Sequence, residues 1–174
     1  MYKVLSIVIL ALIGLTFSAH VGKNDLMNNF DFNSQTGHVV WVFDGDTIAV
    51  RLPGNSGNYE ANLIGVDAAG WGEDGGSCYA LEAAKFLKKL IFNKDVDITW
   101  DTGEKVDRRG RLLVYLKING IDVNEEVIKQ GNAWVPRKYV IDKKSIYLEA
   151  ERVARESKVG LWGSCSEGYL EHRP

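Results

Sequence analysis

The chain has 174 residues, which is enough for one domain with a hydrophobic core of its own. Its 21 Lys and Arg against 23 Asp and Glu give a formal net charge of −2. Strong non-specific binding to nucleic acid requires concentrated Lys and Arg, so this balance argues against such binding and leaves room only for a local basic patch.

Residues 1–19 have the features of a secretory signal peptide. Lys3 precedes an apolar run from Val4 to Phe17, and the small residues Ser18 and Ala19 follow. The run is too short to span a bilayer. We therefore expect a secreted or periplasmic protein with no membrane span after cleavage. An uncleaved anchor is the alternative, because Phe17 is poorly suited to the position three residues before a cut after Ala19.

Three further segments follow the leader. Residues 20–37 are mostly polar and predict a flexible arm. Residues 38–163 contain the periodic apolar patterns of a folded domain, and residues 164–174 form a C-terminal tail. We see no internal repeat, so the expected organisation is one domain.

The domain is expected to begin with β-structure. The run from Val39 to Phe43 is rich in β-branched and aromatic residues and predicts a first strand. Asp44-Gly45 predicts a tight type I′ turn, because that dipeptide tolerates the positive φ angles of such a turn. A second strand over Thr47 to Leu52 and a third over Tyr59 to Val66 are expected to flank a loop rich in Pro and Gly.

A helix and two more strands are expected after a glycine-rich, mobile stretch at 69–77. Apolar residues recur at helical spacing from Cys78 to Phe92; they are Ala80, Ala83, Ala84, Leu87, Leu90 and Ile91. The segments Val96 to Trp100 and Leu112 to Ile118 have the composition of strands. Asn119-Gly120 then signals a hairpin.

Two helices are expected in the last part of the domain. Asn124 is the expected N-cap of a helix from Glu125 to Gln130 that stops at Gly131. Lys143 to Lys158 is the last helix, with four residues expected to point inward: Ile146, Ala150, Val153 and Ala154. Five strands with interspersed helices predict an α+β fold, mainly β, in which a small closed barrel has about three helices packed outside.

Several short motifs occur in one fixed order along the chain. They are Asp44-Gly45-Asp46-Thr47, Gly65-Val66-Asp67-Ala68, Glu82-Ala83, Asp107-Arg108-Arg109-Gly110-Arg111, Val123-Asn124-Glu125, Gln130-Gly131-Asn132-Ala133 and Gly160-Leu161-Trp162. In this order, the chain from Val39 to Trp162 resembles the staphylococcal nuclease (thermonuclease) family. The resemblance implies an OB-fold barrel with three helices, a calcium-dependent nuclease ancestry, and DNA or RNA as the partner. We expect a monomer.

Two carboxylates are candidates for a calcium site. Asp46 follows the first turn and Asp67 ends the expected third strand, so the two can converge at one end of a barrel. Calcium prefers several hard oxygen ligands. The resemblance implies that Asp46, Asp67 and the backbone carbonyl of Ala68 bind the ion. Turn chemistry is the alternative for Asp46, and it is the preferred interpretation for Asp44.

Arg111 is the candidate phosphate ligand and catalytic group, because it matches a family arginine that binds the scissile phosphate. A planar guanidinium binds phosphate oxygens in a bidentate way that lysine cannot match. A solvated arginine in a charged turn is the alternative.

Two positions depart from the family pattern. Asn62 stands where a second arginine is expected, and Gly70 where the resemblance implies a glutamate general base. A phosphate-clamping arginine is worth ~10³ to 10⁵ in rate, and a general base about 10² to 10⁴. Nuclease activity is therefore expected to be impaired or absent. A binding module without catalysis is the competing hypothesis.

Other side chains could compensate for these losses. Glu73 could act as a relocated base, although a solvated acidic loop is the favoured interpretation. Arg108, Arg109 or Arg137 could reach the phosphate. Arg109 and Arg137 stand where the family often has tyrosines that line the nucleotide pocket, and Tyr139 matches another of these.

Cys78 and Cys165 permit one intrachain disulfide. Export favours a bridge between them, and two independent thiols are the alternative. The aromatic residues Trp100, Tyr115 and Trp134 are expected in turns and in the core and not in a base-stacking surface.

Overall fold

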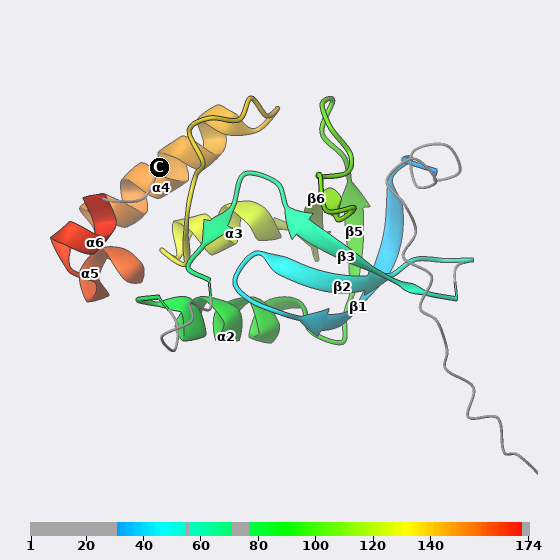
Figure 1. Ribbon diagram of the computed structural model, residues 1–174, viewed down its shortest axis with the longest axis horizontal. Coiled ribbons are helices and arrows are strands. Elements are labelled where there is room, and N and C mark those ends of the chain that lie inside the picture. Colours follow the sequence, from blue (N-terminus) through cyan, green and yellow to red (C-terminus); the bar gives the residue numbers. More distant parts are fainter. Residues whose placement is uncertain (1–30, 55, 71–76, 172–174) are drawn as a thin grey trace, which may run out of the picture.

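Five strands close into a barrel in the computed structural model, with helices packed below and to the left of it in Figure 1. The structure describes residues 31–54, 56–70 and 77–171, so the predicted leader and most of the predicted arm lie outside it. The elements are β1 (Gln35–Val42), β2 (Thr47–Arg51), β3 (Asn58–Leu63), β4 (Asp67–Ala68), α2 (Ala80–Ile91), β5 (Asp95–Thr99), β6 (Leu112–Ile118), β7 (Ile121–Asp122), α3 (Val123–Lys129), β8 (Ala133–Trp134), α4 (Lys144–Glu156), α5 (Leu161–Ser164) and α6 (Glu167–Glu171).

The barrel runs in the order β3-β2-β1-β5-β6 with antiparallel neighbours, and a parallel pairing of β3 with β6 closes it. In that pairing Ala61 lies opposite Leu112, and Asn62 lies opposite Leu113. Closure removes the sheet edges that a five-stranded sheet would otherwise expose. The predicted α+β barrel with packed helices is thereby confirmed.

The third strand is shorter than expected. β3 ends at Leu63, and the chain turns at Gly65, whose φ is +76°. A Cβ at Gly65 would lie 2.5 Å from Ile141 Cδ1 and 2.7 Å from Tyr147 Cδ2, so only glycine fits there. Asp67 consequently belongs to the separate strand β4, where it pairs with Trp134 of β8. The first strand also differs, because it begins at Gln35 and not at Val39.

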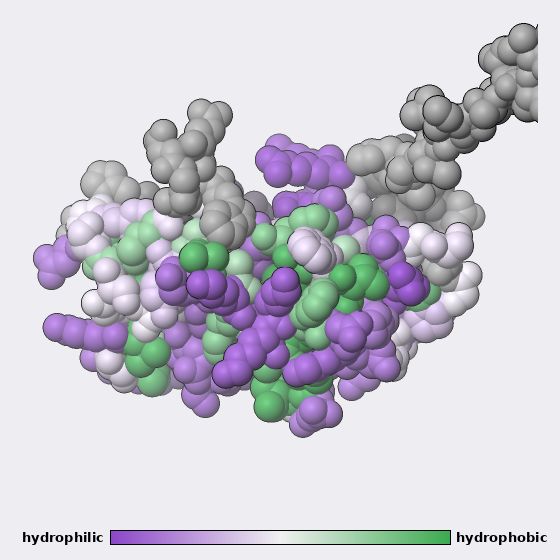
Figure 2. Space-filling model, turned by 90° about the horizontal axis from the view of Figure 1, so that it is seen from below, coloured by the Kyte–Doolittle hydropathy of each residue, from purple (hydrophilic) through white to green (hydrophobic). Residues whose placement is uncertain are grey.

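α2 buries the apolar stripe that the sequence predicts, with Ala83, Leu87 and Ile91 completely inside. Its outward side carries lysines. Figure 2 looks onto this face, where purple hydrophilic side chains alternate with green apolar ones. The helix thus covers one side of the barrel and presents a mixed surface to solvent.

Asn124 is not the N-cap of α3. Asp122 has that role, since its Oδ1 accepts a hydrogen bond from the amide of Glu125 at 3.1 Å. Asn124 lies inside the helix and is completely buried. Its Oδ1 accepts from the amide of Leu116, and its Nδ2 donates to the carbonyls of Ile64 and Val114. Its amide therefore joins the helix to two segments of the barrel, a contact that local spacing does not predict.

α4 is rotated relative to the expectation. Ile146 and Val153, expected inside, are 51% and 42% exposed. Tyr147 and Glu151 are buried in their place. Both buried residues have polar atoms that find partners within the protein, and an apolar pattern alone cannot anticipate them.

The predicted disulfide is confirmed. Cys78 and Cys165 are bonded, with their Cα atoms 5.9 Å apart. The bridge tethers the start of the tail to the residues that precede α2. The Asn119-Gly120 hairpin is also confirmed, because φ is +50° and +83° at these residues between β6 and β7. None of the helices in the described part of the chain has the length and apolar character to cross a membrane.

Candidate functional site

The turn between β1 and β2 positions the first carboxylates. Asp44 is a turn residue, as expected, because its Oδ1 accepts from the amides of Asp46 at 3.0 Å and Thr47 at 2.7 Å. The type I′ prediction is wrong, since neither Asp44 nor Gly45 has a positive φ. Gly45 serves close packing instead. A Cβ there would lie 2.6 Å from Ala68 Cβ and 2.7 Å from Ala83 Cβ, so glycine allows the turn to rest on β4 and α2.

Asp46 is held by the protein at both carboxylate oxygens. Oδ1 lies 2.9 Å from Thr47 Oγ1, and Oδ2 accepts from the amide of Ala68 at 2.7 Å. Burial raises its pKa to about 7, and the carboxylates of Asp44 and Asp67 act in the same direction. The hydrogen bonds from Ala68 and Thr47 oppose that rise. Asp46 and Asp67 are therefore close enough for their charges to interact.

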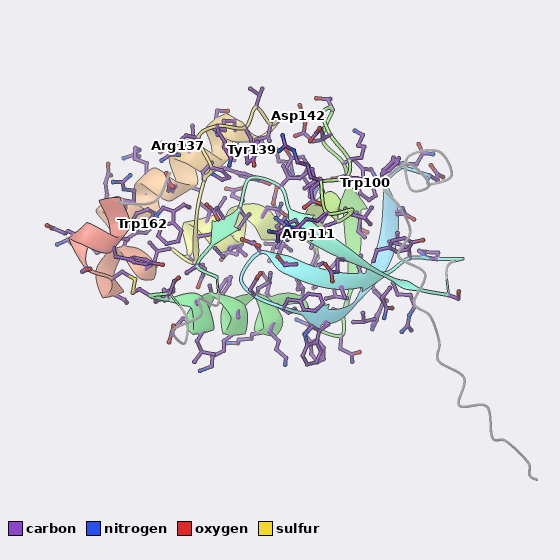
Figure 3. All side chains as sticks on the ribbon, in the orientation of Figure 1. Trp100, Arg111, Arg137, Tyr139, Asp142 and Trp162 are labelled. Carbon is purple, nitrogen blue, oxygen red and sulfur yellow. A yellow bond between two sulfur atoms is a disulfide. The ribbon has the colours of Figure 1, made fainter. Side chains whose placement is uncertain are left out.

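Asn62 connects this carboxylate to Arg111. Thr47 and Asn62 are cross-strand partners in β2 and β3, and Thr47 Oγ1 lies 2.8 Å from Asn62 Oδ1. The same amide oxygen accepts from Arg111 Nη1 at 2.9 Å. The β3–β6 closure makes this contact, because Arg111 immediately precedes β6. Arg111 is central in Figure 3, beside these strands.

Asp107 fixes the other side of Arg111. Its Oδ2 accepts from Arg111 Nε at 2.7 Å, and its Oδ1 accepts from the amides of Arg109 and Arg111. Burial acts to raise the pKa of Asp107, but these hydrogen bonds and the charge of Arg111 hold it below its ordinary value. Arg111 is thus an ordered, half-buried side chain. Arg108 and Arg109 lie on the exposed outside of the turn.

The sequence motifs contained two positioning residues whose roles were not anticipated. Thr47 bridges Asp46 and Asn62, and Asp107 orients Arg111. The signals were available, since Thr47 directly follows Asp46 and Asp107 precedes Arg111 by four residues. Neither spacing specifies a contact until the barrel is closed.

Arg137 and Tyr139 lie on the segment that precedes α4, above Arg111 in Figure 3. Arg137 Nη2 donates to Glu151 Oε2, and Glu151 Oε1 accepts from the amide of Val135 at 2.9 Å. The Glu151 side chain is only 3% exposed, so Arg137 neutralises a buried carboxylate. Tyr139 is 55% exposed. Their predicted roles in substrate binding stay predictions.

The resemblance implies a glutamate general base at position 70, and this chain has a glycine there. None of the described residues lies within 4 Å of a Cβ built on Gly70, and the φ of Gly70 is not positive, so the described part of the structure leaves room for a larger side chain there. Glu73, the predicted relocated base, lies outside the described residues.

The donor chemistry around Asp46 fits a hard cation. Asp46 and Asp67 offer carboxylate oxygens in a region that already carries an excess of negative charge, which is what raises the pKa of Asp46 beyond the effect of burial. In the described ranges no three side chains of the types His, Cys, Asp and Glu gather into a metal-binding group. A cation here would need backbone carbonyls or water to complete its ligands.

Comparisons of the sequence with known proteins find a matching family model and several relatives. Residues 60–164 match a family model described as staphylococcal nuclease homologue. An uncharacterized protein of Bacillus anthracis is 33% identical over 141 residues, which are 79% of this chain and 64% of that protein. The SPbeta prophage-derived endonuclease YokF of Bacillus subtilis is 31% identical over 75% of this chain and 44% of its own length. An uncharacterized endonuclease of Haemophilus influenzae is 30% identical, with 73% and 66% covered. The chain thus spans less than two thirds of each of these relatives.

Proposed function

The chain belongs to the staphylococcal nuclease homologue family, and from this we propose that it binds DNA or RNA at a phosphate site built on Arg111. We propose further that Asp46 and Asp67 hold Ca²⁺ beside that phosphate, and that hydrolysis is slow because two parts of the catalytic apparatus are substituted. Two of the relatives are named endonucleases, which supports nucleic acid as the class of substrate.

The hydrogen-bonded chain Asp46–Thr47–Asn62–Arg111 carries the proposal. It connects one guanidinium, through Asn62 and Thr47, to the partly buried carboxylate of Asp46. The remaining guanidinium N–H groups of Arg111 can donate to phosphate oxygens, which supplies positive charge where negative charge grows during hydrolysis. Calcium, when bound, supplies further positive charge next to the same phosphate.

Asn62 explains why hydrolysis is expected to be slow. A second arginine at this position would add a charge against the phosphate, whereas the Asn62 amide oxygen accepts from Arg111 and contributes no charge. Gly70 has no group that can take a proton from water. The two losses need not add fully, because residues that act together are strongly non-additive.

Export is part of the proposal. The N-terminal segment has the composition of a signal peptide, and the disulfide Cys78–Cys165 is of the kind that persists in oxidising compartments. The expected state in solution is a monomer.

The direct test is release of acid-soluble nucleotides from DNA and RNA in Ca²⁺ and in EGTA, together with binding of a 3′,5′-bisphosphorylated nucleoside. We expect binding that Arg111→Ala weakens at least about tenfold, and nucleotide release near background. A charge-matched control is Arg108→Ala, on the exposed side of the same turn. Equal effects of the two substitutions on binding would count against the phosphate site.

A further inference from the structure

An exposed aromatic and basic surface lies outside the Arg111 site. Trp41, on β1, is 48% exposed, and Phe43 at the end of that strand is 43% exposed. The ring of Phe92, at the C-terminal end of α2, meets Trp41 edge-on with the centroids 6.1 Å apart. A bulge interrupts the β1–β2 register between Val39 and Trp41, and bulges of this kind redirect a side chain.

Lysines of α2 frame these rings. Lys88 Nζ lies 4.9 Å from the Trp41 ring centroid and 5.0 Å from that of Phe92. Lys85 and Lys89 are exposed and lie on the same side of the helix, because residues three and four apart are neighbours on a helical surface. Among residues 31–54, 56–70 and 77–171, none of these lysines forms an ion pair with a carboxylate. This face, onto which Figure 2 looks, therefore carries three lysines that form no carboxylate ion pair within the described part of the chain, on a protein whose net charge is negative.

We propose that this surface, formed by Trp41, Phe92, Lys85, Lys88 and Lys89, binds single-stranded nucleic acid beside the Arg111 site. Aromatic side chains stack on exposed bases, and lysines contact the phosphates between them. The bases of a duplex are already stacked on each other, so a duplex cannot offer their faces to Trp41. The inference rests on the proposed function only for the class of ligand.

A ligand can replace the contacts that Lys88 makes with the Trp41 and Phe92 rings. Lys88 covers the rings through a cation–π contact, which is weak at an exposed site. A base stacked on an aromatic ring interacts more strongly, so a base can displace Lys88, whose flexible side chain can then reach a phosphate. Trp41 lies on the hairpin whose turn carries Asp46, five residues further along the chain.

Fluorescence anisotropy with a labelled oligothymidylate, in EDTA and over a range of salt concentrations, tests the proposal. Trp41→Thr is expected to weaken binding about fivefold or more. Lys88→Gln is expected to reduce the slope of log K against log salt by about 0.7, which is the contribution of one phosphate contact. The matched controls are Ile121→Thr, at a 47% exposed strand residue, and Lys129→Gln, at an exposed lysine of α3; both should leave binding unchanged.

Three results would overturn the proposed binding surface. They are no binding of the oligothymidylate by the unmodified protein, unchanged binding by both Trp41→Thr and Lys88→Gln, or equal losses of binding in the two control variants. Lys88→Gln keeps the test decisive if Trp41→Thr unfolds, because Lys88 is an exposed helix residue.

The experiment distinguishes failure of the proposed Arg111 phosphate site from failure of the proposed single-strand surface. Loss of binding in Arg111→Ala alone would retain the phosphate site and reject the surface, whereas loss in the Trp41 and Lys88 variants alone would do the reverse. If a duplex binds as tightly as the single strand, and Trp41→Thr weakens duplex binding as well, the preference for single strands is rejected.

Discussion

The amide oxygen of Asn62 lies 2.9 Å from Nη1 of Arg111 and accepts its hydrogen bond. The residue at the position of an expected second arginine thus orients the first one. Its oxygen also lies 2.8 Å from Thr47 Oγ1, which connects it to Asp46. The proposed phosphate site therefore contains a single guanidinium, and the proposed calcium ion is the source of any further positive charge there.

Thr47→Val should destabilise the protein. Thr47 is only 7% exposed, and its hydroxyl lies within hydrogen-bond distance of both Asp46 and Asn62. Its single proton can be donated to only one of these oxygens at a time, and removal of the hydroxyl leaves that partly buried acceptor without this donor, which costs about 1 to 3 kcal/mol. Urea denaturation measures the free energy of unfolding. Thr36→Val, at an exposed residue of β1, is the control and should change it by less than about 0.5 kcal/mol. Equal values for the two variants would mean that the hydroxyl contributes nothing.

The stability of the calcium-free protein should fall as pH rises from about 4 to about 7. The folded state keeps the Asp46 proton up to a pKa of about 7, whereas the unfolded chain releases it near 3.8. The folded state thus binds more protons in this window, and the free energy of unfolding falls by up to roughly 4 kcal/mol across it. Asp46→Asn should flatten the pH dependence, and Asp97→Asn, at an exposed residue of β5, should not. A pH profile that Asp46→Asn leaves unaltered would refute this assignment.

Calcium should raise the melting temperature by mass action, and more at pH 8 than at pH 5, because a protonated Asp46 is a poor ligand. Asp46→Asn combined with Asp67→Asn should abolish the rise. Differential scanning calorimetry with and without millimolar Ca²⁺ measures it. An unchanged melting temperature in the unmodified protein at pH 8 would argue against a working site, although not against the fold.

Arg137→Met should destabilise the protein more than Arg152→Met. Arg137 pairs with Glu151, whose side chain is 3% exposed, so its loss removes the ion-pair partner of a buried carboxylate and leaves it only the amide of Val135 and the charge of Lys144. Breaking a buried pair costs about 3 to 5 kcal/mol, which is an upper value here because Arg137 is half exposed. Arg152 pairs with Glu149 and Glu156 on the surface, where such pairs are worth about 0 to 1 kcal/mol. Chemical denaturation distinguishes them. Equal losses would show that Glu151 does not depend on Arg137.

Replacement of Cys78 and Cys165 together by Ala should lower the free energy of unfolding. The bridge joins residues 87 apart in sequence, for which the chain-entropy model gives about 4 to 5 kcal/mol as an upper value. Non-reducing mass spectrometry of exported protein should find no alkylatable thiol in the folded state. Two free thiols there would contradict the bridge.

The sequence predicts the barrel well, because alternation and turn residues are local signals that the closed sheet satisfies. β6 matches its predicted bounds of Leu112 to Ile118, and the Asn119-Gly120 turn has the expected backbone. The failures occur where a distant partner decides the outcome. Gly65 ends β3 because Ile141 and Tyr147 leave no room for a side chain.

The candidate site shows the same contrast between local sequence signals, which are predictable, and contacts with distant partners, which are not. Local motifs identify Asp46, Asp67 and Arg111, and the substitution at Asn62 is visible in the sequence. The use of Asn62 as an acceptor for Arg111 is not, because it depends on the parallel pairing of β3 with β6. The burial of Glu151 is likewise missed, since a charged residue in a helical stripe is ordinarily assigned to solvent.

Restoration of the two substituted positions tests the central claim most directly. Release of acid-soluble nucleotides should be measured in Ca²⁺ and EGTA for the unmodified protein, Asn62→Arg, Gly70→Glu and the double variant. Among the described residues, none lies close enough to Gly70 to obstruct the new side chain. We expect release near background for the unmodified protein, and an increase of at least about 100-fold in the double variant, larger than in either single variant and lost in EGTA. Calcium-dependent cleavage by the unmodified protein at a rate equal to that of the double variant would contradict the account.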